Sequence, residues 1–380
     1  MTRRQRSILF IVSLVTVGAL VAVVAWIAVG AGGSGSGSQQ AGGSDDEQDP
    51  QVLGEAFLDD WVDNGRVVRR DQGDDTVSEG QAYGLLLAVA TGRENDVDEI
   101  WDWTTANLVR DDGLLSWQWS DGAVVDDEPA SDADLDAARA LVLAGDRFER
   151  PDLTEAGTTL ATAIINEMTV ETAAGRILLP GPWALAMDPH PYNPSYSSPA
   201  AYSILEDATG DSRWAELAAG SAAVTTTLLE QTLLPPDWAQ VHSDGTITPR
   251  AGASGTDDSV DYSYDAARLA LRYAESCEAS DVALAAKLAP TLSRTGNLPA
   301  QLDLGGGNLT TDEHPLAYAA RAAAEASAGN LLDANNDLAR AAELSESTPT
   351  YYGTAWTALA GFMVTDTVLG GCAVLEETSS

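Results

Sequence analysis

Between about residue 51 and residue 375 the sequence is a succession of helix-forming stretches with almost no strand pattern. Clusters of Gly, Pro, Asp and Asn separate segments whose apolar residues recur at helical spacing, and such clusters end helices. Strand-type alternation is rare and short, with residues 114–119 as the best candidate. We predict twelve helices, over residues 55–64, 78–91, 96–108, 132–145, 152–168, 196–209, 211–230, 261–276, 280–294, 312–328, 331–344 and 351–368.

The predicted helices alternate in character. Those that begin at residues 78, 132, 196, 261, 312 and 351 are apolar on most sides, whereas the others carry charge on one face. A helix that is apolar all round belongs in the interior, and an amphipathic helix belongs outside. We therefore predict an all-α fold, an (α/α)6 barrel with six inner and six outer helices. The inner helices then all begin at one end of the barrel.

The N-terminal segment, residues 1–31, predicts a membrane anchor. Three arginines precede an uncharged apolar run from Ile8 to about Val29, which is long enough to cross a bilayer as a helix. Positive charge before the run places the C-terminal part outside the cell, so we expect a single-pass protein of the cell membrane. The small residues at 29–31 leave cleavage as a signal peptide, and hence secretion, as the alternative.

The rest of the chain divides into three parts. Residues 32–50 are Gly, Ser, Gln and acidic residues, a composition typical of a flexible linker. Residues 51–375 contain no second linker and predict one large domain, and residues 376–380 form a short tail.

Charge and cysteine content limit the partners. The net charge is −38 and Lys287 is the only lysine, so the surface repels nucleic acid, and we expect a monomer. Such acidity fits a salty habitat, although biased codon usage also replaces Lys with Arg. Cys277 and Cys372 form either one disulfide or two separate buried thiols. Because the three histidines are scattered and no Cys/His cluster has zinc spacing, we expect neither a metal site nor a cofactor.

Glu79 opens the predicted helix at 78–91. One interpretation is a capping box, with Thr76 as N-cap and Glu79 as its return partner. The glycines at 80 and 84 favour a functional interpretation, since glycine costs a helix about 1 kcal/mol relative to alanine and suggests close packing on that face.

Two further acidic stretches begin predicted inner helices. Asp132, Asp134 and Asp136 repel one another, so capping after Ser131 explains only one or two of them. Asp265 precedes Arg268 by three residues, which is either an ordinary helix ion pair or a carboxylate that the arginine keeps ionised. Opposed carboxyl groups across a cleft are the equipment of glycoside hydrolysis.

At these residues the chain resembles glycoside hydrolase family 8, the bacterial endoglucanase family that includes the endoglucanases of cellulose-synthesis systems. The family signature of Ala, Ser or Thr, Asp, Ala or Gly, and Asp matches residues 130–134. Its acid motif resembles residues 78–84, and its Asn-Pro-Ser-Tyr, Tyr-Asp-Ala-x-Arg and last aromatic motifs resemble residues 193–196, 264–268 and 351–352. Residues 270–271 are Ala-Leu where the family often has Pro-Trp.

The resemblance implies an (α/α)6 barrel that hydrolyses β-1,4-glucan with inversion and without metal. It implies Glu79 as general acid, Asp265 as general base, and Asp132 as the residue that holds the distorted sugar. We expect a raised pKa for Glu79 and an ordinary one for Asp265. The predicted sugar-binding residues are Tyr83, Trp119, Trp183, Tyr196, Tyr264, Arg268, Tyr351 and Tyr352.

Two alternatives remain open at this point. Chitosanase or xylanase activity occurs among relatives of the family, and an acidic chain attracts cationic chitosan. A catalytically silent glycan-binding protein is the other alternative, but it has no need of both Glu79 and Asp265.

Overall fold

The computed structural model describes residues 49–257 and 259–375. The predicted membrane helix and nearly all of the predicted linker lie outside these residues. Among the described helices, none has the length and apolar content that crossing a bilayer requires.

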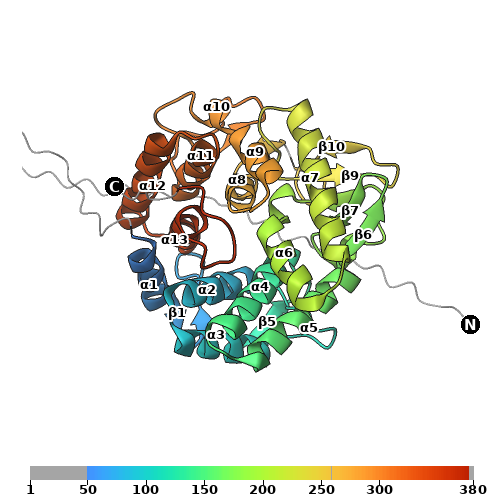
Figure 1. Cartoon of the computed structure of the whole chain (residues 1–380), viewed down its shortest axis with the longest axis vertical. Coiled ribbons are helices and arrows are strands. Elements are labelled where there is room, and N and C mark those ends of the chain that lie inside the picture. The colour runs from blue at the N-terminus through green and yellow to red at the C-terminus, as the bar shows by residue number, and fades with distance from the viewer. Residues whose placement is uncertain (1–48, 258, 376–380) are drawn as a thin grey trace, which may run out of the picture. The chain divides into compact units, whose positions relative to one another are not determined.

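Six helices form a closed ring around the centre of the fold (Figure 1). Each packs against the next in chain order, and the last packs against the first. Their side chains are buried on most sides, which is why the corresponding segments are apolar all round. The inner helices are α2 (Ser78–Thr91), α4 (Ser131–Arg147), α6 (Pro199–Thr209), α8 (Ala267–Ala274), α11 (Pro315–Ser327) and α13 (Tyr351–Thr365).

A second set of helices covers the ring, each packed against the inner helix next to it in the chain. Their buried residues lie on one face, as their amphipathic sequences require. The outer helices are α1 (Pro50–Trp61), α3 (Glu94–Asn107), α5 (Pro151–Glu167), α7 (Arg213–Gln231), α9 (Ala279–Ala286) and α12 (Leu331–Ser347). The predicted barrel of helices is confirmed.

Three helix predictions differ from the structure for local reasons. The predicted helix 55–64 begins earlier, at Pro50, and ends at Trp61, because residues 62–63 form a strand. The predicted helix 280–294 is divided into α9 and the single turn α10 (Ala289–Leu292), because Pro290 cannot donate the backbone hydrogen bond that a continuous helix needs. Helix α8 begins at Ala267 and not at 261, since residues 261–262 form a strand and residues 263–266 a turn.

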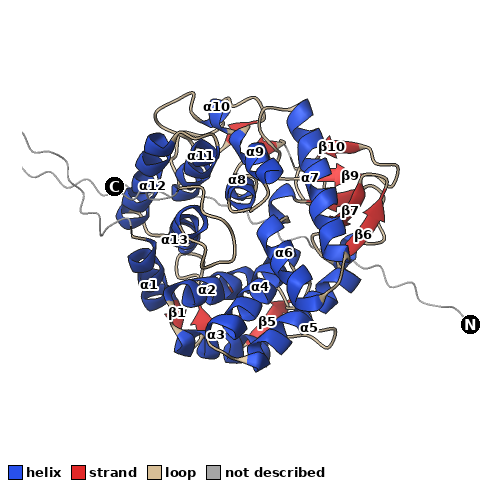
Figure 2. Ribbon diagram, in the orientation of Figure 1, coloured by secondary structure: helices blue, strands red, loops and turns tan. Residues whose placement is uncertain are grey.

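Short antiparallel strands lie in the connections that lead from an outer helix to the next inner helix (Figure 2). The predicted strand at 114–119 overlaps one of them, and the others have too few residues for a pattern to show. The sheets are β1 (Val62–Asp63) with β2 (Arg66–Val67); β3 (Thr76–Val77), β4 (Gln118–Ser120) and β5 (Ala123–Asp126); β6 (Thr169–Thr172) with β7 (Gly175–Leu178); β8 (His190–Tyr192), β9 (Ala239–Val241) and β10 (Ile247–Pro249); and β11 (Asp261–Tyr262) with β12 (Leu302–Asp303). These connections meet the first turns of the inner helices.

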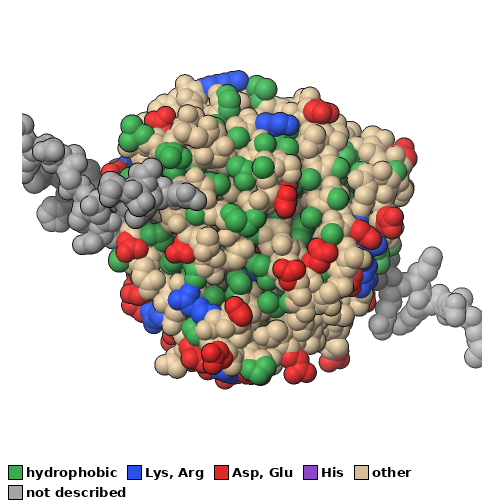
Figure 3. Space-filling view, viewed as in Figure 1, with side chains coloured by type: hydrophobic (Ala, Val, Ile, Leu, Met, Phe, Trp, Pro, Cys, Tyr) green, Lys and Arg blue, Asp and Glu red, His purple; other side chains and the backbone are tan. Residues whose placement is uncertain are grey.

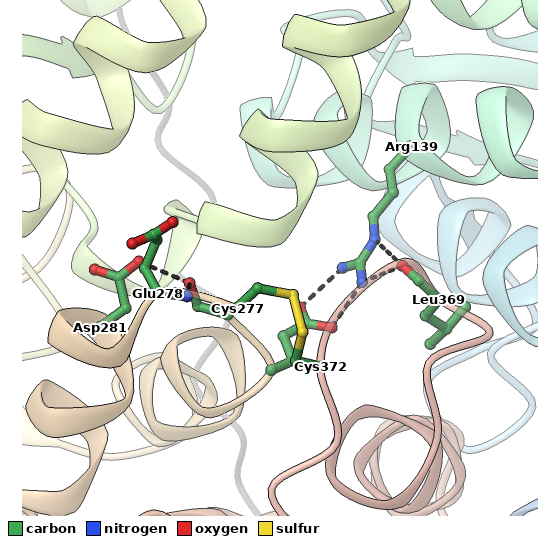
Figure 4. Close-up of a disulfide and its surroundings, with 8 residues drawn as sticks. Arg139, Cys277, Glu278, Asp281, Leu369 and Cys372 are labelled. Carbon is green, nitrogen blue, oxygen red and sulfur yellow. Dashed lines mark hydrogen bonds and ion pairs between the residues drawn. A yellow bond between two sulfur atoms is a disulfide. The ribbon is translucent and has the colours of Figure 1, made fainter.

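At the other end of the barrel the C-terminal segment is held by a disulfide between Cys277 and Cys372, whose Cα atoms are 5.0 Å apart (Figure 4). The backbone N–H of Cys372 also donates to the carbonyl of Glu275, which ends α8. Of the two alternatives for the cysteines, the structure therefore shows the disulfide.

The surface reflects the acidic composition. In the view of Figure 3, red acidic side chains are spread over the described part, and blue basic ones occur at few places. Several partly exposed arginines lie against carboxylates, as Arg150 does with Asp98 and Asp152.

Candidate active site

Glu79 lies in the first turn of α2, and it does not take part in a capping box. The N-cap residue is Val77, and the Thr76 hydroxyl donates to the carbonyl of Val67 at 2.7 Å. The Glu79 carboxyl instead accepts a hydrogen bond from the hydroxyl of Tyr83, one turn further along α2. Its side chain is 22% exposed, so it is mostly buried but still accessible to solvent.

The glycines of this helix allow close packing, as the sequence suggested. A Cβ atom at Gly80 would lie 2.9 Å from the hydroxyl of Tyr351. One at Gly84 would lie 2.8 Å from a methyl group of Val67. Helix α2 therefore approaches both α13 and the β2 connection more closely than any larger residue permits.

The acids at the start of α4 each have a separate partner, and capping explains none of them. The N-cap of α4 is Ala130, which has no oxygen in its side chain. Asp132 accepts from Arg268, Asp134 accepts from the backbone N–H of Leu115, and Asp136 pairs with Arg272. All three acids are buried, so these partners replace water.

Arg268 brings the three candidate catalytic carboxyls together. Its Nη1 atom lies 2.8 Å from Asp132 Oδ2 and 3.7 Å from Glu79 Oε1. Its Nη2 atom lies 2.7 Å from Asp265 Oδ1. Asp265 therefore forms the predicted ion pair with Arg268, and that same guanidinium also contacts groups from α2 and α4. The side chain of Asp265 is 31% exposed, which leaves it open to a water molecule.

The surroundings raise the pKa values of Glu79 and Asp265. Burial, followed by the charge of Asp132, raises the pKa of Glu79 to about 7. Burial raises the pKa of Asp265 to about 6, even though Arg268 lowers it. The expectation of an ordinary pKa for Asp265 is therefore wrong, because burial together with the charges of Asp237 and Asp132 outweighs the arginine.

Arg268 belongs to a ladder of buried ion pairs between α4 and α8, which we call the interior ladder. Both helices supply residues at the spacing i, i+4 and i+7, so the pairs follow one another along the two helices. The polarity reverses at the last pair, which is next to the C-terminal segment. The three pairs are Asp132–Arg268 at 2.8 Å, Asp136–Arg272 at 2.7 Å and Glu275–Arg139 at 2.6 Å.

Some predicted sugar-binding residues lie at the site and remain partly exposed. The guanidinium of Arg268 lies 5.3 Å above the ring of Tyr196, and the hydroxyl of Tyr352 donates to the carbonyl of Tyr264. The ring of Tyr264 packs edge-on against His314 at 5.1 Å. These three tyrosines are partly buried, and they present both ring surface and polar groups beside the acids.

Two predicted sugar-binding residues lie elsewhere than expected. Tyr83 and Tyr351 are 1% and 2% exposed, and their rings stack at 6.4 Å behind Glu79. The assignment of these two residues to sugar contact is therefore corrected, because they offer no surface to a sugar. The same correction applies to Arg268, which is 1% exposed and whose guanidinium binds Asp132 and Asp265.

Two predicted sugar-binding tryptophans lie in connections between helices. Trp119 on β4 packs against Trp103 and carries the guanidinium of Arg66 over its ring at 4.7 Å. Trp183 is 38% exposed in the connection before α6, beside Gly181. Both belong to outer-to-inner connections, at the end of the barrel where the inner helices begin.

The sequence interpretation missed two residues. Trp356 on α13 is fully buried, and its Nε1 donates to the hydroxyl of Tyr83 at 3.1 Å. Asp237 accepts hydrogen bonds from the backbone of Ser263 and Ala266, both at 2.8 Å, and so holds the turn that carries Asp265. Trp356 looks like core in an apolar helix, and Asp237 lies in a connection with no local pattern. The spacing of residues in the sequence therefore identifies neither Trp356 nor Asp237.

The barrel and the cluster of carboxyls at the starts of its inner helices define a protein of the glycosidase class. Residues 53–366 match the model of the glycosyl hydrolases family 8. The match covers most of the chain, and the protein belongs to this family.

Relatives and solved structures agree with this assignment. The chain is 33% identical over 217 residues to a probable endoglucanase of Novacetimonas hansenii. The matched region covers 55% of this chain and 62% of that relative. It is 30% identical to an endoglucanase of Cellulomonas uda, over 49% of this chain and 54% of the relative. The chain thus matches little more than half the length of these curated relatives.

The structural similarity is more extensive. The endo-β-1,4-glucanase CMCax from Acetobacter xylinum has a TM-score of 0.70 and 26% identity, with 83% of this chain and 98% of that chain covered. A β-1,3-1,4-glucanase from Paenibacillus sp.X4 has a TM-score of 0.74 at 20% identity, over 89% and 96% of the two chains, and shows the shared fold.

Proposed function

We propose that the protein is an endo-acting glycosidase that cleaves β-1,4-linked glucan with inversion at the anomeric carbon. The single observation that carries the proposal is the cluster at Arg268. One guanidinium contacts three carboxyls, from α2, from α4 and from the turn that precedes α8, and two of them, Glu79 and Asp265, remain accessible to solvent. The substrate class rests on the relatives, which are named endoglucanases and endo-β-1,4-glucanase.

In this mechanism Glu79 is the general acid. It donates its proton to the glycosidic oxygen as the bond between that oxygen and the anomeric carbon breaks. A pKa of about 7 keeps the carboxyl protonated in mildly acidic solution, where an ordinary glutamate is ionised. The hydroxyl of Tyr83 fixes the orientation of the carboxyl.

Asp265 is the general base. It takes a proton from a water molecule that attacks the anomeric carbon from the opposite face of the sugar. Its pKa of about 6 lies below that of Glu79, so between these values the base is ionised while the acid is protonated. Arg268 holds Asp265 at 2.7 Å, and Asp237 holds the backbone turn around it.

Asp132 shares the guanidinium of Arg268 with the acid and the base. Its Oδ2 accepts from Arg268, and the other oxygen, Oδ1, is buried and has no hydrogen-bond partner among the described residues. Positive charge develops on the sugar ring in the transition state, and a buried carboxylate next to it is stabilising. We assign Asp132 to hold the sugar at the point of cleavage.

Tyr196, Tyr264 and Tyr352 are proposed to contact the sugars at the point of cleavage. Trp119 and Trp183 are proposed to stack on sugars further along the chain. Partly exposed aromatic rings offer flat apolar surface to sugar faces and polar groups to sugar hydroxyls. No metal or cofactor enters any step of the proposed reaction.

The test is hydrolysis by the purified protein of carboxymethyl cellulose, lichenan, xylan and chitosan. We expect cleavage of the two glucans with a rapid loss of viscosity, and the first product seen by NMR should be the α-anomer. Cleavage of chitosan or xylan alone would contradict the substrate assignment. A first-formed β-anomer would contradict inversion and indicate a covalent intermediate.

We also propose that the apolar run from Ile8 to about Val29 anchors the protein, with its barrel outside the cell. Cell fractionation with protease added from outside tests this proposal. The anchor predicts a membrane-bound chain whose barrel is accessible to the external protease. A mature protein that begins near residue 32 in the medium would replace the anchor by a cleaved signal peptide.

A further inference from the structure

The hydroxyl of Tyr83 contacts three groups from three helices. Glu79 Oε1 on α2 is hydrogen-bonded to it, Trp356 Nε1 on α13 lies 3.1 Å away, and Arg268 Nη1 on α8 lies 3.3 Å away. Tyr83 is 1% exposed, and Trp356 and Arg268 are as deeply buried. The hydrogen bonds of this hydroxyl are therefore made with these protein groups and not with bulk water.

The chemistry of these groups fixes the direction of each hydrogen bond. An indole N–H and a guanidinium are donors only, and a hydroxyl offers two acceptor lone pairs and one hydrogen. Trp356 and Arg268 therefore occupy both lone pairs of Tyr83 Oη. The single hydrogen of the hydroxyl must point to Glu79 Oε1, which accepts it.

This direction determines where a protonated Glu79 carries its proton. If the proton were on Oε1 and pointed to Tyr83, the hydroxyl would have to accept a third hydrogen bond and its own hydrogen would lose its acceptor. Arg268 Nη1 also lies 3.7 Å from the same Oε1, and a cation there favours lone pairs over a proton. We propose that Trp356 is a positioning residue that, through Tyr83, keeps the transferable proton of Glu79 on Oε2.

The indole is itself held firmly. Its ring meets the ring of Tyr83 edge-on at 5.3 Å, and the guanidinium of Arg272 lies 5.2 Å above it. Arg272 is paired with Asp136 in the interior ladder. The second pair of the ladder thus holds Trp356 in place. Trp356 in turn orients the hydroxyl of Tyr83, which orients the carboxyl of Glu79.

The inference rests on the proposed role of Glu79 as general acid. In Trp356→Phe, one lone pair of the Tyr83 hydroxyl becomes free to accept from the carboxyl, and the proton is then shared between the two oxygens. We expect kcat on a cello-oligosaccharide to fall about 3–10-fold, the factor that one hydrogen bond of ordinary strength represents. An aryl cellobioside with a dinitrophenolate leaving group needs little protonation, so its cleavage should change by less than about twofold.

The matched control is Trp214→Phe. Trp214 is equally buried, packs against Tyr202 at 6.0 Å and lies on the outer helix α7. It should leave the ratio of the two rates unchanged. Equal slowing of both substrates by Trp356→Phe would show a merely structural role and overturn the proposal.

Two further variants keep the test decisive. Tyr83→Phe removes the hydroxyl with a smaller change of volume, and it should reproduce the selective loss on the oligosaccharide even if Trp356→Phe folds poorly. It should also move the alkaline limb of the pH profile to higher pH, because the hydrogen bond from Tyr83 lowers the pKa of Glu79. An unchanged rate ratio in Tyr83→Phe would contradict the proposal. Glu79→Gln separates the two hypotheses: if it retains full activity, the proposed function fails whatever Trp356→Phe does.

Discussion

Replacing Glu79 by glutamine should abolish most turnover and, at the same time, stabilise the protein in alkaline solution. Glutamine keeps the shape of the side chain, and its carbonyl oxygen still accepts from the hydroxyl of Tyr83. It has no proton to transfer, so we expect kcat to fall by about 10²–10⁴.

The stability change follows from the pKa. In the folded protein the pKa of Glu79 is raised from 4.5 to about 7, chiefly by burial. Between these values the folded state binds more protons than the unfolded state, so its stability falls as the pH rises through this window. At about 1.4 kcal/mol per pKa unit, ionised Glu79 destabilises the fold by ~3 kcal/mol above pH 7. The neutral variant lacks this penalty.

Thermal unfolding of wild type and Glu79→Gln at pH 5 and pH 8 measures the effect. At about 2 °C per kcal/mol for a domain of this size, the variant should melt about 6 °C above wild type at pH 8. At pH 5 the two should nearly coincide. Glu155→Gln, an exposed glutamate on α5, is the control and should show no such dependence. A melting difference that is the same at both pH values would refute the raised pKa.

The remaining predictions concern the base, the disulfide and the surface charge. Activity should peak between about pH 6 and pH 7, because Asp265 must be ionised and Glu79 protonated. If the residual activity of Asp265→Asn still falls at low pH as wild-type activity does, the role of Asp265 as the base is contradicted. Cys372→Ser opens a loop of 95 residues and should lower the free energy of unfolding by about 2–4 kcal/mol in denaturant titrations, with kcat per folded molecule unchanged at low temperature. With a net charge of −38, the melting temperature should rise as NaCl is added, and a flat or falling response would show that self-repulsion is unimportant.

The sequence was sufficient to predict the barrel because its periodic pattern is long and repeated. Inner helices differ from outer ones by being apolar on most sides, and each predicted inner helix corresponds to one in the ring. The acids at the helix starts were also predictable, since the glycines at 80 and 84 favoured a functional interpretation of Glu79 and capping explained at most two of three acids within five residues.

The residues that the sequence could not identify act across the fold. Trp356 reaches Tyr83 over a separation of 273 residues, and within its own helix it is one more apolar residue. The pKa of Asp265 depends on charges from other segments, including Asp237, so its neighbour Arg268 alone gave the wrong expectation. Tyr83 and Tyr351 look like sugar-binding aromatics until packing shows that they are covered.

The interior ladder did leave a signal in the sequence. Residues 132, 136 and 139 read acid, acid, base, and residues 268, 272 and 275 read base, base, acid, at the same spacing. Complementary charges at matching positions of two buried helices indicate pairing across a core, because unpaired buried charges are too costly to retain.

The ladder also explains how an interior so rich in charge serves a reaction that depends on pKa values. Replacing a buried ion pair by apolar residues is often neutral or stabilising, so stability alone does not account for three such pairs. In this barrel the first pair supplies Arg268, which contacts both the acid and the base, and the second supplies Arg272, which holds Trp356. The third pair meets the C-terminal segment, since Arg139 also donates to the carbonyl of Leu369 at 3.0 Å (Figure 4). The ladder thus links α4 to α8 along their length. It holds the charged groups at the catalytic end in place, and it ends where the disulfide holds the C-terminal segment.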